Sequence, residues 1–348
     1  MPEFWIADRP VGTDHEPLVV AELGINHEGS LAVALEMAGA AIAAGAEIIK
    51  HQTHIVDEEM SFEAKSAVPG NARESIYEIM QRCSLSESEE FALRDYVLDQ
   101  GVLFISTPFS MAAVERIGAM DLPAVKIGSG ECGNLPLIRE VLMLRKPLII
   151  STGMHSLASI RPTVDLVRDA GVPYALLHCT NLYPTPPHLV RLGALAQMQE
   201  EFPDAVLGLS DHSTTIYPCV AAVALGARIL ERHFTDRSDR PGPDIVCSMD
   251  PDQLTELRLA SRIVFEARDG DKGPAAEESV TIAFAFGSVV ALTDLRVGDV
   301  LTKNNIGVKR PSGGAHGPAD FTELLGQRVA ESVPANRQLP RTVLRGGA

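Results

Sequence analysis

The chain has 348 residues, 45% of them apolar, a size that suits one large barrel with a small domain or two mid-sized domains. Its 46 acidic and 30 basic side chains give a net charge of −16, which argues against nucleic acid or an anionic membrane as partners, because both require a basic surface. The five cysteines are odd in number and contain no C-x-x-C pair, and the start MPEFWIADRP resembles no signal peptide, so we expect a reducing, cytoplasmic location.

Short apolar runs that predict β-strands recur along the first part of the chain, and most are followed by a helix-like stretch. Several of these stretches begin with Ser and end with Gly, as at 30–45, 86–101 and 156–171, which is typical of a capped helix. The predicted strands are 18–23, 47–52, 102–107, 124–129, 147–152, 174–179, 205–210 and 227–232. Continuously apolar strands indicate a parallel sheet covered by helices, and eight such units over about 265 residues predict a (β/α)₈ TIM barrel. A doubly wound open sheet is the alternative, although no G-x-G-x-x-G follows the first strand.

Two segments interrupt this regular spacing. Residues 55–85 form a long insertion after the second strand, which in a barrel is a loop on the active-site face and therefore a candidate lid or substrate contact. Residues 268–283 are polar and rich in Gly and Pro, which predicts a linker between a barrel domain, 1–267, and a small β-rich domain, 284–348.

Polar side chains at the ends of the predicted strands are candidate site residues, because the carboxyl ends of barrel strands converge on one site. Lys50 and Gln52 share a face of their strand, as do Glu231 and His233. Such groups are costly at apolar strand ends unless they are used or paired. The full set of candidates from these strands is Glu22, Lys50, Gln52, Thr107, Lys126, Ser129, Ser151, Asn181, Tyr183, His212, Glu231 and His233.

His212 and His233 follow adjacent predicted strands and are candidate ligands for a metal such as manganese, iron, cobalt or zinc. The alternative is a pair of polar site histidines that bind no metal. Lys50 and Lys126 are candidate anion receptors beside the hydroxyls of Ser129 and Ser151, the alternative being lysines that extend to solvent. Asp244, in the loop sequence DRPGPD, is a candidate contact for a sugar hydroxyl.

Many separated motifs resemble those of the bacterial N-acetylneuraminate (sialic acid) synthase family. They are AELGINHEGS, IIKHQTHIVDEEMS, PGNARESIYEIM, STPFS, KIGSGE, STGM, NLYPTP, GLSDH and LERHFTDRSDRPGPDIVCSM. The C-terminal FGSVVALTDLRVGDVLTKNNIGVKRP resembles the antifreeze-like (SAF) domain that ends these enzymes. The sequence departs from the family pattern at Gly287, where Ala is expected, and in the Gly-rich loop after Arg310.

The resemblance implies a TIM barrel joined to an SAF domain, in a domain-swapped homodimer whose small domain covers the partner's barrel. It implies that His212 and His233 bind the metal, usually Mn²⁺, with Mg²⁺ or Co²⁺ as substitutes. The phosphoenolpyruvate site that it implies consists of Lys50, Gln52, Thr107, Lys126, Ser129, Ser151 and Asn181. The positions implied to contact an N-acylated hexosamine or assist the chemistry are Glu22, Asn71, Tyr183, Asp244 and, from the partner, Arg310.

The expected reaction is condensation of phosphoenolpyruvate with N-acetylmannosamine and water, giving N-acetylneuraminate and phosphate. Glu22, His233 and Asp244 are the expected catalytic residues. A legionaminic or pseudaminic acid synthase that uses a diacetamido-deoxyhexose is the nearest alternative. A non-catalytic sugar-binding protein is the alternative of another class.

Overall fold

A computed structural model describes residues 2–69, 73–341 and 343–344 of the chain. The chain divides into two compact units, Met1–Asp269 and Gly270–Ala348. Among the described residues no helix combines the length and the apolar character that crossing a bilayer requires.

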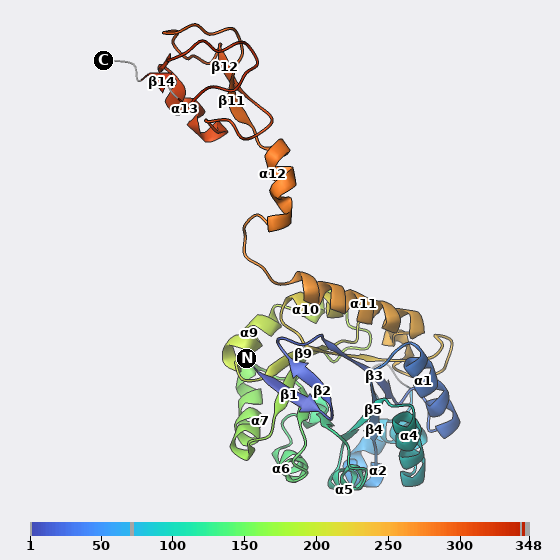
Figure 1. Ribbon diagram of the computed structural model, residues 1–348. Coiled ribbons are helices and arrows are strands. Elements are labelled where there is room, and N and C mark those ends of the chain that lie inside the picture. The colour runs from blue at the N-terminus through green and yellow to red at the C-terminus, as the bar shows by residue number, and fades with distance from the viewer. Residues whose placement is uncertain (1, 70–72, 342, 345–348) are drawn as a thin grey trace. The chain divides into compact units, whose positions relative to one another are not determined.

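The first unit is a closed barrel of eight parallel strands surrounded by helices (Figure 1). The strands pair in the order β10-β3-β4-β5-β6-β7-β8-β9, so the last strand closes against the first. They are β3 (Leu18–Gly24), β4 (Ile48–Thr53), β5 (Leu103–Pro108), β6 (Val125–Ile127), β7 (Leu148–Ser151), β8 (Tyr174–Cys179), β9 (Val206–Ser210) and β10 (Ile229–His233). The predicted TIM barrel is therefore confirmed, and the doubly wound alternative is wrong.

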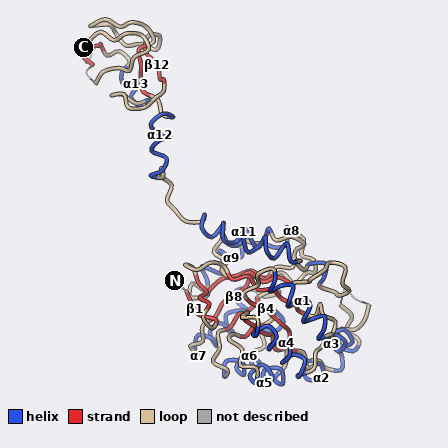
Figure 2. The backbone as a smooth tube through the Cα atoms, turned by 45° about the vertical axis from the view of Figure 1, so that its right-hand side comes forward, coloured by secondary structure: helices blue, strands red, loops and turns tan. Residues whose placement is uncertain are grey.

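The helices of this unit lie around the outside of the barrel (Figure 2). Where the sequence predicts a capped helix, Ser30 and Ser156 accept hydrogen bonds from the first turns, and Ser86 forms a capping box with Glu89. Gly171 ends its helix in the left-handed conformation that glycine tolerates. The helices are α1 (Leu31–Ala43), α4 (Glu87–Asp99), α5 (Met111–Ala119), α6 (Leu135–Met143), α7 (Leu157–Ala170), α8 (Pro187–Val190), α9 (Ala194–Glu201), α10 (Tyr217–Ala224) and α11 (Pro251–Ala267).

The inward-facing residues of each strand change from apolar to polar along the barrel axis. Side chains alternate between the two faces of a strand, so every second residue points into the barrel. At the amino-terminal end these are apolar and form one buried cluster, which includes Leu18, Ile48 and Ile149. At the carboxyl-terminal end the same faces carry Glu22, Lys50 and Ser151. This polar end of the barrel interior is where the site lies.

A short hairpin that the sequence analysis did not predict packs against the apolar end of the barrel interior. Its strands, β1 (Glu3–Ile6) and β2 (Arg9–Gly12), are antiparallel and contribute Phe4, Ile6 and Val11 to the inner apolar cluster. The side chain that alternates outward, Trp5, is 55% exposed.

The insertion at 55–85 contains α2 (Val56–Glu59), a 3₁₀ turn η1 (Phe62–Lys65) and α3 (Ile76–Cys83). A capping box between Ser75 and Glu78 starts α3, and its buried residues Ile79 and Cys83 face the barrel unit. The insertion is therefore a structured part of the barrel rim in its described residues.

The second unit has its own apolar core. It contains Val289, Ala291, Leu295, Leu301, Ile306, Leu324, Val329, Val333 and Leu339. Its elements are η4 (Ala276–Glu278), α12 (Ser279–Ala285), β11 (Ser288–Ala291), β12 (Ile306–Lys309), η5 (Pro318–Asp320), α13 (Phe321–Leu324), β13 (Arg328–Val329) and β14 (Val343–Leu344). The end of the predicted linker forms α12, which the sequence analysis did not expect.

Candidate active site

A cavity of about 310 Å³ opens at the carboxyl ends of the barrel strands. It brings together thirteen of the predicted site residues: Glu22, Lys50, Gln52, Thr107, Lys126, Ser129, Ser151, Asn181, Tyr183, His212, Glu231, His233 and Asp244. Asn71 lies outside the described residues. Arg310 is an exposed residue of the second unit.

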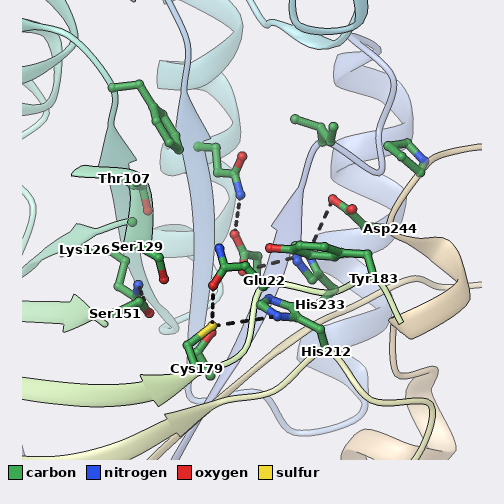
Figure 3. A pocket seen from close by; sticks show the side chains of 18 of the residues that line it. Glu22, Thr107, Lys126, Ser129, Ser151, Cys179, Tyr183, His212, His233 and Asp244 are labelled. Atoms are coloured by element: carbon green, nitrogen blue, oxygen red, sulfur yellow. Dashed lines mark hydrogen bonds and ion pairs between the residues drawn. The ribbon is translucent and has the colours of Figure 1, made fainter. Parts of the chain in front are cut away.

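The strand register explains how residues distant in sequence meet in this cavity. Glu22 of β3 is the register partner of both Lys50 in β4 and His233 in β10, and Gln52 is the partner of Thr107. Figure 3 shows Thr107, Lys126, Ser129 and Ser151 on one side of the cavity and His212, His233, Tyr183 and Asp244 on the other, with Glu22 between them. The site thus has a hydroxyl- and lysine-rich side facing a histidine- and carboxylate-rich side.

Two lysines and two glutamates form a buried charge cluster at the floor of the cavity. Lys50 donates to Glu22, and its ammonium lies 3.6 Å from Glu231 Oε1. Lys126 lies at the same distance, 3.6 Å, from Glu231 Oε1. All four side chains are almost fully buried, so each charge depends on the others for compensation.

The charge cluster shifts the pKa values of its members in different directions. For Lys50, burial lowers the pKa, but Glu22 and Glu231 outweigh that effect and the net change is upward. For Lys126, burial lowers the pKa and Lys50 adds to this, so that the net change is downward despite Glu231. For Glu22, burial raises the pKa, but Lys50 and His233 more than offset it and hold it well below the usual range. Lys126 is therefore the cation with more to gain from an incoming anion.

Hydrogen bonds hold Lys126 and Ser129 in place, and the backbone of Gly153 lies close to the Asn181 side chain. Lys126 Nζ donates to Ser151 Oγ at 2.6 Å and to the Ile127 carbonyl at 3.0 Å. The Gly153 amide donates to Ser129 Oγ at 3.0 Å, and a Cβ at Gly153 would collide with the Asn181 amide oxygen. A side chain at Gly153 would therefore displace the Asn181 amide from its present position.

The imidazole rings of the two candidate metal ligands, His212 and His233, lie next to each other, with centroids 5.3 Å apart and planes tilted by 35°. His212 Nδ1 lies 3.1 Å from the Thr180 carbonyl, which assigns its hydrogen to Nδ1 and leaves Nε2 with a free lone pair. Burial, with His233 beside it, lowers the pKa of His212 to about 3, so the ring is neutral as metal binding requires. His233 Nδ1 is buried without a hydrogen-bond partner, at 3.8 Å from Glu22 Oε2 and 3.9 Å from Asp244 Oδ2.

These features fit a divalent metal held by two imidazoles. A buried nitrogen without a hydrogen-bond partner is energetically costly, and binding to a metal ion is one way to satisfy it. In the described part of the chain no group of three or more His, Cys, Asp or Glu side chains is arranged to hold a metal ion. The described protein thus offers two nitrogen ligands and leaves the other positions for substrate or water.

Tyr183 and Asp244 complete the histidine side of the cavity. The Tyr183 ring centroid lies 4.2 Å from that of His212 and 5.8 Å from that of His233. Burial raises the pKa of Tyr183 well above its usual value, so its phenol stays protonated and can donate. Asp244 precedes a 3₁₀ turn, Ile245–Cys247, and burial also raises the pKa of its carboxyl group.

A buried ion pair beneath the histidines was missed by the sequence analysis. Arg232 donates to Asp211 and to the carbonyls of Ser213, Thr215 and Cys247. It therefore ties the loop that carries His212 to the loop that follows Asp244. No periodic pattern marks Arg232, because its side chain points out of the barrel, toward the loops.

The cavity also contains residues that were not predicted from the sequence, and two of them continue the inward-facing pattern of a strand. His54 continues the alternation of Lys50 and Gln52 one residue beyond the end of β4, but it was not predicted as a site residue. Cys179 lies on the inward face of β8; its thiol is 3.1 Å from Asn181 Oδ1, and burial raises its pKa to about 12. The apolar wall is formed by Ile25 after β3, Phe109 after β5, and Pro69, Ile76, Ile79 and Met80 of the insertion, and no local sequence pattern indicated it.

Comparison with known families gives two matches along the chain. The NeuB family profile matches residues 37–272, and the SAF domain profile matches residues 286–341. The first lies almost entirely in the barrel unit and the second in the small unit.

Relatives of known name are similar over nearly their whole length. The N,N'-diacetyllegionaminic acid synthase of Legionella pneumophila is 32% identical over 345 residues, covering 95% of each chain. The human N-acetylneuraminate-9-phosphate synthase is 31% identical over 331 residues, covering 93% of this chain and 92% of its own. The crystal structure of the N-acetylneuraminic acid synthetase of Leptospira borgpetersenii superposes with a TM-score of 0.74 at 26% identity, covering 80% of this chain and 95% of that one.

Proposed function

The chain belongs to the NeuB family, and on that premise we propose that it is a synthase that condenses phosphoenolpyruvate with N-acetylmannosamine and water, releasing N-acetylneuraminate and phosphate. The observation that carries the proposal is the two-sided cavity. Its hydroxyl and lysine side suits an anionic phosphate ester, and its histidine side suits a metal and an aldehyde. The names of the relatives agree with a sugar-acid synthase.

The proposed chemistry forms one carbon–carbon bond and replaces the carbon–oxygen bond to phosphate by a carbon–oxygen bond from water. The methylene carbon of phosphoenolpyruvate attacks the aldehyde of the open-chain sugar, which leaves positive charge on the former enol carbon. Water adds at that carbon, and the resulting tetrahedral intermediate expels phosphate. His212 and His233 would hold a divalent metal, Mn²⁺ in this proposal, which would supply Lewis-acid polarisation of the aldehyde oxygen.

In this proposal the part that each side chain takes in the reaction depends on where it lies in the cavity. Lys126 and Ser151, already hydrogen-bonded to each other, are placed to receive the phosphate or carboxylate of phosphoenolpyruvate. Glu22 already accepts from Lys50 and Gln52, so in this proposal it orients water or aldehyde and does not serve as a free base. Tyr183 and Asp244 lie beside the histidines, where the sugar hydroxyls would bind.

The acceptor in this proposal carries no phosphate. The cations among the described lining residues are Lys50 and Lys126, and both lie at the floor with Glu22 and Glu231. The part of the wall that the insertion contributes is apolar and consists of Pro69, Ile76, Ile79 and Met80. A diacetamido-deoxyhexose is the second candidate, because that wall suits acyl and methyl groups and because a named relative at 32% identity is a legionaminic acid synthase.

The reaction is tested by phosphate release from phosphoenolpyruvate labelled with ¹⁸O in the bridging oxygen, with manganese and each sugar in parallel. We expect release with N-acetylmannosamine and the label in phosphate, because the bond broken is carbon–oxygen. Label retained in the sugar acid would contradict the mechanism. Faster turnover with the diacetamido-deoxyhexose would reassign the acceptor, and no release with any sugar, the corresponding sugar phosphate included, would contradict an enzymatic function.

We further propose that the active unit is a domain-swapped homodimer in which Arg310 completes the site of the partner subunit. In support, Arg310 is exposed on the second unit, and α12 with its flank carries exposed Val280, Phe284 and Phe286. Apolar side chains grouped in this way are common at interfaces between subunits.

The exchange of domains is tested by mixing inactive chains. Arg310→Ala leaves the barrel intact, and Lys50→Ala leaves Arg310 intact, so a mixed dimer has one complete site. Random mixing makes half of the dimers mixed, and we expect about a quarter of wild-type activity. The control mixes Lys50→Ala with His233→Ala, which both damage the barrel and should restore nothing. No recovery in the first mixture would show that each chain completes its own site.

A further inference from the structure

Four side chains form a continuous hydrogen-bonded chain from the insertion to the floor of the cavity. His54 Nδ1 lies 3.0 and 3.1 Å from the two carboxylate oxygens of Glu59, and His54 Nε2 lies 3.0 Å from Gln52 Oε1. The amide nitrogen of Gln52 then donates to Glu22 Oε1 at 2.6 Å. The pair at the far end is well shielded, since the side chains of His54 and Glu59 are each 4% exposed.

The donor and the acceptor of each hydrogen bond in this series can be assigned in turn, starting from Glu22 at the cavity. Glu22 accepts from the Lys50 ammonium, so the Gln52 amide must present its nitrogen to Glu22 and its oxygen to His54. An amide oxygen only accepts, which requires a hydrogen on His54 Nε2. The Glu59 carboxylate also accepts, which requires a hydrogen on Nδ1. Both ring nitrogens of His54 therefore act as donors.

This arrangement links the insertion to the site. Glu59 is the last residue of α2, at the start of the insertion whose residues Ile76, Ile79 and Met80 line the cavity. The His54 ring is fixed in a second direction by stacking on Phe109, with centroids 4.4 Å apart and planes 13° apart. A ring held on three sides in this way can set the angle of the Gln52 amide.

We propose that His54, carrying both ring protons against Glu59, is a positioning residue that aims the Gln52 amide at Glu22 and couples the fold of the insertion to that carboxylate. The protonation and the coupling stand on the geometry alone. Their effect on turnover rests on the proposed function.

The protonation is tested by ¹H–¹⁵N imidazole spectra of the substrate-free full-length chain at neutral pH. The His54 signal is identified by its loss in His54→Gln. We expect both nitrogens of His54 to show protonated shifts in the wild type, and one to lose its proton in Glu59→Gln. An unprotonated nitrogen in the wild type, or a Glu59→Gln spectrum identical to it, would overturn the proposal whether or not the chain is a synthase.

The positioning role is tested by steady-state kinetics. We expect His54→Ala to lower kcat by about 10- to 100-fold with the KM for phosphoenolpyruvate within a few-fold of wild type. His54→Gln keeps a donor toward Gln52 and should recover most of the loss. Unchanged kcat in His54→Ala, equal losses in both variants, or a rise in the sugar KM alone would overturn the role.

The matched control is Tyr77→Phe. The Tyr77 hydroxyl, in α3, donates at 2.7 Å to Asp57 of α2, the helix that also carries Glu59. This hydrogen bond is not part of the series that reaches Gln52. Its loss reports on simple loosening of the insertion. We expect Tyr77→Phe to keep wild-type kcat, and a loss equal to that of His54→Ala would show that general loosening explains both.

Discussion

His233→Ala is expected to reduce turnover by about 1000-fold, because the metal proposed for this site would stabilise the transition state by several kcal/mol. His233 Nδ1 is buried with no hydrogen-bond partner, so the ring is not needed there for an internal hydrogen bond. Binding of Mn²⁺ should weaken in parallel. Calorimetric titration with Mn²⁺ alone, together with the rate of phosphate release, measures both effects.

His178→Ala is the matched control for the loss of a buried imidazole. His178 lies on β8, is buried, and donates to the Val190 carbonyl, but it does not line the active-site cavity. We expect His178→Ala to retain Mn²⁺ binding while losing some stability. Metal-dependent activity that survives in His233→Ala would rule out the ligand assignment, and an equal loss in His178→Ala would assign the effect to packing.

Arg232→Met should lower the free energy of unfolding of the barrel unit by about 3–5 kcal/mol. Arg232 and Asp211 each have 1% of their side chains exposed, so removing the guanidinium leaves a buried carboxylate without its countercharge. The variant also loses the donors to the carbonyls of Thr215 and Cys247. Urea unfolding followed by the fluorescence of Trp5, the single tryptophan, reports on the barrel unit.

The control for this effect is an exposed ion pair. Arg161 pairs with Glu201 on the surface, and Arg161→Met should change the free energy of unfolding by less than about 1 kcal/mol. If Arg232→Met does not fold, Asp211→Asn provides a milder test, with an expected loss of about 1–3 kcal/mol. Losses no greater than that of Arg161→Met would show that the buried pair does not hold the loops together.

The barrel could be predicted because its signal is local and repeated. Each strand is a largely apolar run such as YALLHC, and some of the helices carry a Ser N-cap, with a Gly C-cap as well in α7. The β1–β2 hairpin and α12 lacked such a signal. The strands of the hairpin have only four residues each and only β1 alternates, and α12 follows a polar segment whose composition indicated a linker.

The same distinction applies to the site: features with a local sequence pattern could be predicted, and features without one could not. Residues at strand ends could be selected because the period of two and the parallel register place their side chains at one end of the barrel. The sequence by itself therefore determined which side chains meet: Lys50 and Lys126 across from His212 and His233. Only the tertiary structure decided how they are paired. Three such arrangements form only when distant segments come together: Glu22 lies between Lys50 and His233, Glu59 pairs with His54, and Arg232 pairs with Asp211. No local pattern encodes the distance between segments that meet only when the barrel closes.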